Sequence, residues 1–249
     1  MLLHHCTWPE VEARLARDTS IIVPIGSTEQ HGPNGLIGTD ALCAEVVAKG
    51  VGEAADALVA PTISVGMAQH HLGFTGSMTL RPSTLIAVVR DTVQSLARHG
   101  FDRIYFINGH GGNVATVTAA FSEVYAESSL DGARRNASGL RCRLKNWYDS
   151  AEVRKLSKEL YGEAEGSHAT PSEVALTQFA FPDSIKRAEM SPAIAPSGPI
   201  HDAFDYRRRF PDGRIGSNPA LATPEAGRRL YEAAVADMTA DYREFLIAD

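Results

Sequence analysis

The stretch RIYFINGHGGN, residues 103–113, decides the fold of this chain of 249 residues. It begins with a short apolar run, which is typical of a buried β-strand. A glycine-rich turn follows, and its glycines allow other backbone or a ligand to approach closely. The residues from 113 to about 127 then have a helical pattern. The stretch therefore predicts a strand, a tight turn and a helix, in that order.

The same order of elements recurs along the chain. Strands are expected at 21–26 (IIVPIG), 57–65 (ALVAPTISV) and 140–147. Helices are expected at 40–54, 152–161 and 171–181, and from Pro224 to about 246. A further helix is expected to have Ser83 as its N-cap and Gly100 as its C-terminal stop. Alternating strands and helices predict an α/β fold with a mostly parallel sheet. Residues 191–222 are rich in Pro, Gly and Arg, have no clear period, and are expected to form a long ordered excursion or lid.

Composition narrows the class of protein. Hydrophobic residues make up 44% and charged residues 22%, which favours one globular domain over residues 1–249. The net charge of −6 and the lack of a long basic run argue against nucleic-acid binding, and the RRR run at 207–209 is expected in a solvated loop. The three cysteines are too widely spaced for a disulfide framework or a thiolate zinc site. With no apolar run of membrane-spanning or signal-peptide length, a cytoplasmic protein without a membrane partner is expected.

Polar side chains gather where the expected strands end. Glu29 and His31 follow the strand at 21–26 and are two residues apart. In extended backbone, residues at this spacing direct their side chains to the same side. A glycine-rich loop can then turn back and bring Asp40 beside them. His110 follows the strand at 103–108. Because ligands bind beyond the carboxyl ends of parallel strands, these two carboxylates and two imidazoles predict a cation site.

A third segment, GSHATPSEVALT at 166–177, places His168 before a helix and Glu173 inside it. Other interpretations of these residues stay open. Thr170 and Glu173 have the spacing of a capping box, which explains Glu173 without chemistry. Asp40 is also suited to cap the helix that follows it, and His110 to be a core histidine. The NGHGGN turn is compatible with phosphate binding, but it lacks the lysine of a P-loop.

Taken together, the stretches IVPIGSTEQHGP, GTDA, FTGSMTL, NGHGGN and SHATPSEVALT resemble the creatininase (creatinine amidohydrolase) family over nearly the whole chain. The resemblance implies a three-layer α/β/α sandwich and two divalent metal ions per subunit, either zinc, manganese or iron. It implies one metal on Glu29, Asp40 and His110, and a second on His31 and the shared Asp40. It also implies a homo-oligomer, expected to be a hexamer.

The family pattern further implies that His168 is the general acid or base, with Glu173 as its catalytic companion. Two positions depart from that pattern. Members that hydrolyse creatinine carry Tyr and Glu after the histidine of the second segment, where this chain has Gly111 and Gly112. The second metal is then one protein ligand short, or it takes Glu173 or water instead. This departure also argues against creatinine as the substrate. The residues expected to bind the substrate are His71, Ser77, Gly111 and Trp147, although a lone His71 is more typical of packing.

The expected function is hydrolysis of a C–N bond other than a peptide bond, in a small cyclic or linear amide, by metal-activated water. The alternatives are a peptidase or a formamide deformylase of the same family, or a non-catalytic member that binds a nucleotide.

Overall fold

The structure is a computed structural model that describes residues 1–130 and 139–247. Three strands form one parallel sheet in the order β1 (Ser20–Ile25), β2 (Arg103–Asn108) and β3 (Arg141–Asn146). Ile25 pairs with Asn108, and Asn108 pairs with Asn146. All three strands therefore end at the same edge of the sheet, and the segments that follow them start side by side.

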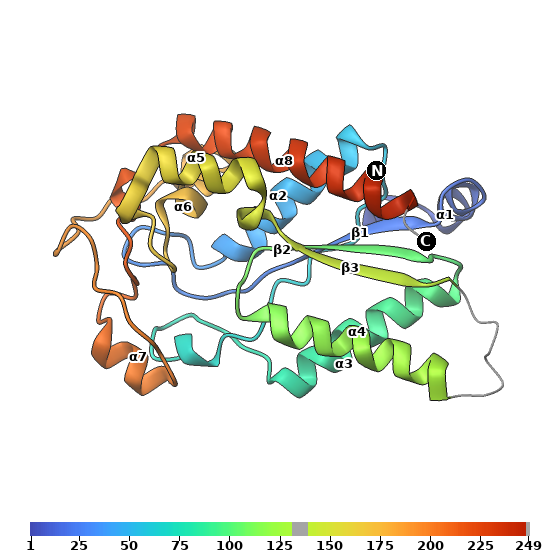
Figure 1. Ribbon diagram of the computed structural model, residues 1–249, viewed down its shortest axis with the longest axis horizontal. Coiled ribbons are helices and arrows are strands. Elements are labelled where there is room, and N and C mark those ends of the chain that lie inside the picture. The colour runs from blue at the N-terminus through green and yellow to red at the C-terminus, as the bar shows by residue number, and fades with distance from the viewer. Residues whose placement is uncertain (131–138, 248–249) are drawn as a thin grey trace.

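Helices cover both faces of this sheet (Figure 1). Alternation along β1 sends Ile22 to one face and Val23 to the other. The face of Ile22 packs against α2 (Thr39–Ala54), α5 (Ala151–Tyr161), α6 (Pro171–Ala180) and α8 (Pro224–Ile247). The face of Val23 packs against α3 (Pro82–Arg98) and α4 (Asn113–Leu130). The predicted three-layer α/β/α sandwich is confirmed.

The remaining elements are short and lie at the edges of these layers. They are η1 (Leu3–His5), α1 (Trp8–Leu15), η2 (Gln69–His71), η4 (Trp147–Asp149), η5 (Gly162–Ala164), η6 (Pro182–Ser184), α7 (Ala203–Arg209) and η7 (Pro219–Leu221). Helix α1 was not expected from the sequence. It has a capping box formed by Thr7 and Glu10, which is a local signal that identifies its start.

The strand predicted at residues 57–65 is wrong. The segment runs parallel to β1 but makes only isolated bridges, from Val59 to Ile22 and from Ile63 to Ile25. Ala60 N–H bonds to Ile22 O at 2.8 Å, and the next backbone bond to β1 runs from Ile63 N–H to Pro24 O at 3.0 Å. Pro24, two residues after Ile22 on the side of β1 that faces this segment, has no N–H to donate to Ala60 O, and the pairing slips by one residue between Ala60 and Ile63, so the ladder is interrupted.

The two ends of α3 were predicted from the sequence, and only the C-terminal prediction agrees with the structure. Ser83 is not the N-cap of α3, because Pro82 begins the helix and Arg81 occupies the cap position. Proline is favoured at the first helical position, where its missing N–H costs nothing. Gly100 does follow the end of α3, and its φ of +106° is a conformation that glycine adopts readily.

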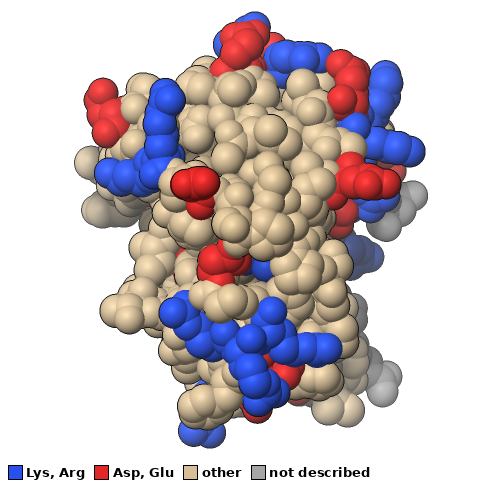
Figure 2. Space-filling model, turned by 90° about the vertical axis from the view of Figure 1, so that its left-hand side faces the viewer, with Lys and Arg blue, Asp and Glu red and all other residues tan. Residues whose placement is uncertain are grey.

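The excursion at residues 191–222 is ordered and contains α7, whose N-cap Asp202 accepts hydrogen bonds from Phe204 N–H and Asp205 N–H. The RRR run forms the last turn of this helix, so the prediction of a loop is wrong, although all three arginines are exposed as expected. Figure 2 shows Lys and Arg side chains gathered over the lower part of the molecule, where α7 lies. None of the described helices has the length and apolar character needed to cross a membrane.

Candidate metal centre

The loop after β1 folds back on itself at the carboxyl edge of the sheet. Glu29 N–H bonds to Ile37 O at 2.6 Å, and Gly35 N–H bonds to His31 O at 3.1 Å. A Cβ at Gly35 would lie closer than 3.0 Å to backbone and side-chain atoms of His31, so this tight return requires glycine. The fold-back leaves Glu29 and His31 buried.

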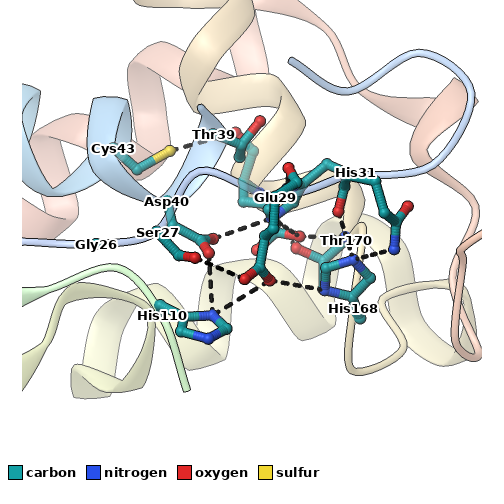
Figure 3. Close-up of polar contacts among 12 residues, drawn as sticks. Gly26, Ser27, Glu29, His31, Thr39, Asp40, Cys43, His110, His168 and Thr170 are labelled. Atoms are coloured by element: carbon teal, nitrogen blue, oxygen red, sulfur yellow. Dashed lines mark hydrogen bonds and ion pairs between the residues drawn. The ribbon is translucent and has the colours of Figure 1, made fainter. Parts of the chain in front are cut away.

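The return of the loop delivers Asp40 into the first turn of α2. The N-cap is Gly38, and no side chain caps this helix, so the alternative that Asp40 is a capping residue is wrong. Its carboxylate points to the two histidines of the site instead (Figure 3). A negative charge in the first turn of a helix is also favoured by the helix dipole.

His110 is held in place by the turn that follows β2. The Asn108 side chain bonds to both the N–H and the C=O of His110, at 3.1 and 2.6 Å. The Nε2 atom of His110 lies 3.0 Å from Met67 O, which is a suitable acceptor for an Nε2–H. The Nδ1 atom therefore faces the carboxylates, to which it donates a proton in the metal-free protein, and it offers a lone pair once it is deprotonated.

The first potential ligand group consists of Glu29, Asp40 and His110, whose ligand atoms all lie within 4.8 Å of one another. His110 Nδ1 is 3.0 Å from Asp40 Oδ2 and 3.3 Å from Glu29 Oε1. Ser27 Oγ–H donates to the other oxygen of Glu29 at 2.7 Å, which leaves Oε1 directed at the group. Glu29 lies in the loop after β1, Asp40 in the first turn of α2 and His110 in the turn after β2. Only the folded sheet brings these three residues together.

The second potential ligand group consists of His31, Asp40 and Glu173. His31 Nε2 is 2.9 Å from Asp40 Oδ1 and 3.6 Å from Glu173 Oε1. His31 Nδ1 lies 3.1 Å from Glu29 O, an acceptor that orients the ring and leaves Nε2 toward the carboxylates. The two carboxylate oxygens of Asp40 therefore face different groups, Oδ1 the group of His31 and Oδ2 the group of His110.

Glu173 belongs to this group and to a helix cap at the same time. Thr170 N–H donates to Glu173 Oε1 at 2.7 Å, and Glu173 N–H donates to Thr170 Oγ1 at 3.2 Å. This is the capping box expected from the sequence. The same carboxylate nevertheless lies beside His31, so capping and metal binding are not exclusive.

Gly112 has no room for a side chain. A Cβ there would lie 2.7 Å from Met67 O and closer than 3.0 Å to His110 Nε2. A Cβ at Gly111 would meet only Tyr148 Oη, at 3.6 Å, which is an ordinary contact. The packing of His110 against Met67 therefore takes the space that a side chain at Gly112 would need.

Histidines and carboxylates in the centre shift one another's ionisation. Burial by itself lowers the pKa of His31, but Asp40 and Glu173 outweigh it and raise this pKa to about 10. Burial also opposes the charge on His110, yet Glu29 and Asp40 raise its pKa to about 9. Burial raises the pKa of Glu173 to about 7, although His31 acts in the opposite direction. Protons on the histidines therefore supply the positive charge that the carboxylates require.

The donor set fits divalent metal ions. Within the two ligand groups, three buried atoms have no hydrogen-bond partner among the described residues, and they are Glu29 Oε1, His31 Nε2 and Asp40 Oδ2. All three are directed into the two ligand groups. Leaving such atoms buried and unpaired is costly, and a cation would satisfy them at once. Nitrogen and oxygen donors suit zinc, manganese or iron(II).

His168 lies beside the centre, with its Nδ1 3.9 Å from Glu29 Oε1. Its Nε2 lies 2.9 Å from both Gln30 O and the Gln30 side-chain nitrogen, so Nδ1 is the ring nitrogen that faces the centre. Burial lowers the pKa of His168 well below its usual value, and the neighbouring His71 and His31 lower it further. His168 is therefore neutral at pH 7.

Gln30 is a residue that the sequence interpretation missed. Its amide nitrogen lies 3.1 Å from His71 Nδ1, 2.9 Å from His168 Nε2 and 3.1 Å from Tyr206 Oη. It thereby joins the metal loop to the excursion that carries α7. The only signal in the sequence was its place between Glu29 and His31, where alternation turns its side chain to the opposite side of the loop.

The four residues expected to contact the substrate lie at different depths. Gly111 lines a pocket of about 490 Å³ that also borders Asp40, His110, His168 and Glu173. His71 is buried, with Nε2 3.0 Å from Glu29 Oε1. Ser77 Oγ accepts a hydrogen bond from Gln30 N–H at 3.1 Å. Trp147 lies in the core without exposed surface, and its neighbour Tyr148 lines the pocket. Their roles in binding stay predictions.

Comparison with known sequences identifies the family. The sequence model of creatininase, described as creatinine amidohydrolase, matches residues 4–241. The chain belongs to the creatininase family. It is 28% identical to the creatinine amidohydrolase of Pseudomonas putida, over 96% of this chain and 94% of that one. It is 29% identical to the mycofactocin precursor peptide peptidase of Mycolicibacterium smegmatis, over 85% of this chain and 79% of that one.

Solved creatininases have the same fold. The structure of a manganese creatininase superimposes with a TM-score of 0.85 at 26% identity, over 99% of both chains. A zinc–zinc form of a glutamate-to-glutamine mutant creatininase gives 0.84 at 25% identity, over 99% of this chain and 98% of that one. The predicted family, fold and hydrolase class are confirmed.

Proposed function

We propose that this creatininase-family hydrolase cleaves the C–N bond of a small amide with two divalent metal ions, one on Glu29, Asp40 and His110 and one on His31, Asp40 and Glu173. Three groups of three residues could hold a metal ion, and the observation that carries the proposal is that two of them share Asp40; the third consists of Glu29, His31 and His168. The names of the relatives support it, since one acts on creatinine and solved creatininases contain manganese or zinc.

Bound metal ions supply a water molecule that is acidic enough to lose a proton near neutral pH, and they polarise the amide carbonyl. The residues of the chain provide the remaining steps. Neutral His168 accepts the proton of the water at Nδ1, the ring nitrogen that faces Glu29 Oε1. It then returns this proton to the leaving nitrogen as a general acid. Glu29 and Asp40 keep the cations at the sheet edge where His168 can reach the substrate.

The fit of the pocket favours an amide other than creatinine. The family resemblance implies that members acting on creatinine line the pocket with a Tyr where this chain has Gly111, and that a Glu where it has Gly112 completes their second metal site; Tyr148 faces the space beside Gly111. Peptide-bond cleavage is the second candidate, and the peptidase relative at 29% identity supports it.

Several finer expectations remain part of this proposal. They are a single domain over residues 1–249, iron as a third possible metal, a cytoplasmic location and a hexameric assembly in which residues 191–222 cover a neighbouring pocket. Light scattering of the purified protein tests the assembly, since an active monomer would contradict it.

The reaction is tested by treating the purified protein with a chelator and restoring zinc or manganese separately. Each preparation is offered creatinine, other cyclic amides, formamides and short peptides. The proposal expects hydrolysis of at least one class only after metal is restored. Full hydrolysis in the metal-free protein would contradict it, and absence of bound metal would favour a non-catalytic member of the family.

A further inference from the structure

We infer that the substrate carries an anionic group, a carboxylate or a phosphate, which binds to Lys158 and Arg154 at the side of the pocket formed by α5. This inference rests on the proposed function, because the same pocket borders Asp40, His110 and Glu173. A substrate with its amide carbonyl at the ligand groups then extends its remaining atoms toward α5.

One face of α5 supplies the polar wall of this pocket. Arg154, Ser157 and Lys158 all line it. Their spacing of three and four residues places them on the same side of the helix. Val153 and Tyr161 are buried in the core, so they fix the rotation of α5 and with it the direction of the polar face.

Lys158 is the cation without a counter-charge. In the part of the chain that the structure describes, no carboxylate forms an ion pair or a hydrogen bond with it. Lys155 on the same helix differs, because its Nζ lies 3.2 Å from Glu152 Oε2 and it does not line the pocket. Both lysines are exposed and only Lys158 lines the pocket, so the two form a matched comparison.

Arg154 is held in position and keeps donors to spare. Its Nε and Nη2 both donate to Asp149 Oδ1, at 3.2 and 3.1 Å. The Nη1 donors have no partner among the described residues. A guanidinium fixed by one carboxylate presents these remaining N–H groups to a second anion in a defined geometry.

The acidic groups around the pocket do not cancel this charge. Asp149 already pairs with Arg154. Glu165 also lines the pocket, and its Oε1 accepts a hydrogen bond from Ser172 Oγ–H. Asp40 and Glu173 face the proposed metal ions rather than α5. The wall at Lys158 is therefore positive, and an anion is the chemistry that complements it.

The test compares three matched probes on the metal-loaded protein by titration calorimetry. N-formylglycine carries a carboxylate, 2-formamidoethyl phosphate carries a phosphate, and N-formylglycinamide is neutral. We expect at least one anionic probe to bind about tenfold more tightly than the neutral one. Lys158→Ala should reduce the affinity for that probe about tenfold and leave the neutral probe unchanged, and Lys155→Ala should change neither. The preferred probe distinguishes a carboxylate from a phosphate substrate.

Equal affinity for charged and neutral probes would overturn the inference. So would an anion preference that persists in Lys158→Ala, since the metal ions alone would then explain it. Lys158→Gln serves as a second variant that keeps the length of the side chain, with circular dichroism as the control for folding. Hydrolysis is recorded separately: a Lys158-dependent preference without turnover of any amide would refute the proposed reaction and retain the anion site.

Discussion

Asp40 is the residue on which both ligand groups depend. Its Oδ1 lies 2.9 Å from His31 Nε2 and its Oδ2 lies 3.0 Å from His110 Nδ1. Burial favours the neutral acid, but the two histidines hold the pKa of Asp40 well below its usual value. Asp40 therefore enters the site as a carboxylate, the form that bridges two cations.

Replacing Asp40 by asparagine should remove both metals and the activity. Losing an outer partner of a metal ligand already costs about 10- to 100-fold in affinity or activity, so losing a shared ligand should cost more than about 100-fold. Elemental analysis and hydrolysis of the best amide measure both effects. Asp91→Asn on the exposed surface of α3 is the control and should retain both. An Asp40→Asn protein with its full metal content would contradict the shared site.

The two roles of Glu173 can be separated by mutation. Glu173→Gln should lose the second metal and most activity, with little change in the midpoint of thermal unfolding, because glutamine also serves in a capping box. Thr170→Ala should do the reverse, with about 1 kcal/mol of destabilisation and an unchanged metal content. If Glu173→Gln keeps two metals and normal turnover, Glu173 is a cap alone.

The stability of the metal-free protein should decrease as the pH rises from about 6.5 to 10. The folded-state pKa values of His110 and His31, about 9 and about 10, lie above the ordinary value of 6.5. Their contribution is fully present below pH 6.5 and is lost as the pH passes through these values. Chemical denaturation of chelator-treated protein measures this trend, and His110→Gln should weaken it. Metal affinity should increase over the same range, because metal replaces the protons. A metal-free stability that does not fall would contradict the protonation of these histidines.

At the scale of elements, the turn between β2 and α4 controls how His110 presents its nitrogen. It contains two adjacent glycines that differ in their surroundings. Gly112 packs against His110 and Met67, whereas Gly111 borders the pocket beside Tyr148. The sequence identified both as departures from the creatinine-hydrolysing pattern, but only the packing shows that they are not equivalent.

Gly112→Ala should therefore displace His110 and impair metal binding, while Gly111→Ala should leave the metal content intact. Overpacking of this kind costs about 1–3 kcal/mol, which unfolding measurements can detect. The paired comparison uses metal titration and thermal unfolding of both variants. Equal behaviour of the two would show that the contact between Gly112 and His110 has no role in the site.

Elements with strong local signals could be predicted from the sequence. The apolar runs of β1 and β2 and the helices that follow them were placed correctly, because burial on both faces and helix ends are marked locally. The segment at 57–65 has the same apolar character, but Pro24 of β1 lacks the N–H that a continuous ladder to this segment needs. Trp147 was read as part of a strand, and it begins the short helix η4 instead.

At the scale of the whole molecule, the parallel sheet brings the site together. Ile25, Asn108 and Asn146 end at one level, so residues more than sixty positions apart meet at one edge. General rules for parallel sheets predicted this meeting for Glu29, Asp40 and His110. The same rules do not specify contacts such as Gln30 with Tyr206 or His110 with Met67, because these depend on loop geometry that has no periodic signal.

The most direct test of the account is anomalous X-ray diffraction from crystals of the zinc-loaded protein. We expect two peaks per subunit. One should lie among Glu29, Asp40 and His110, and the other among His31, Asp40 and Glu173, with Asp40 bound to both ions. A single peak without Asp40 as a ligand, or no peak at either group while the protein remains active, would contradict the account.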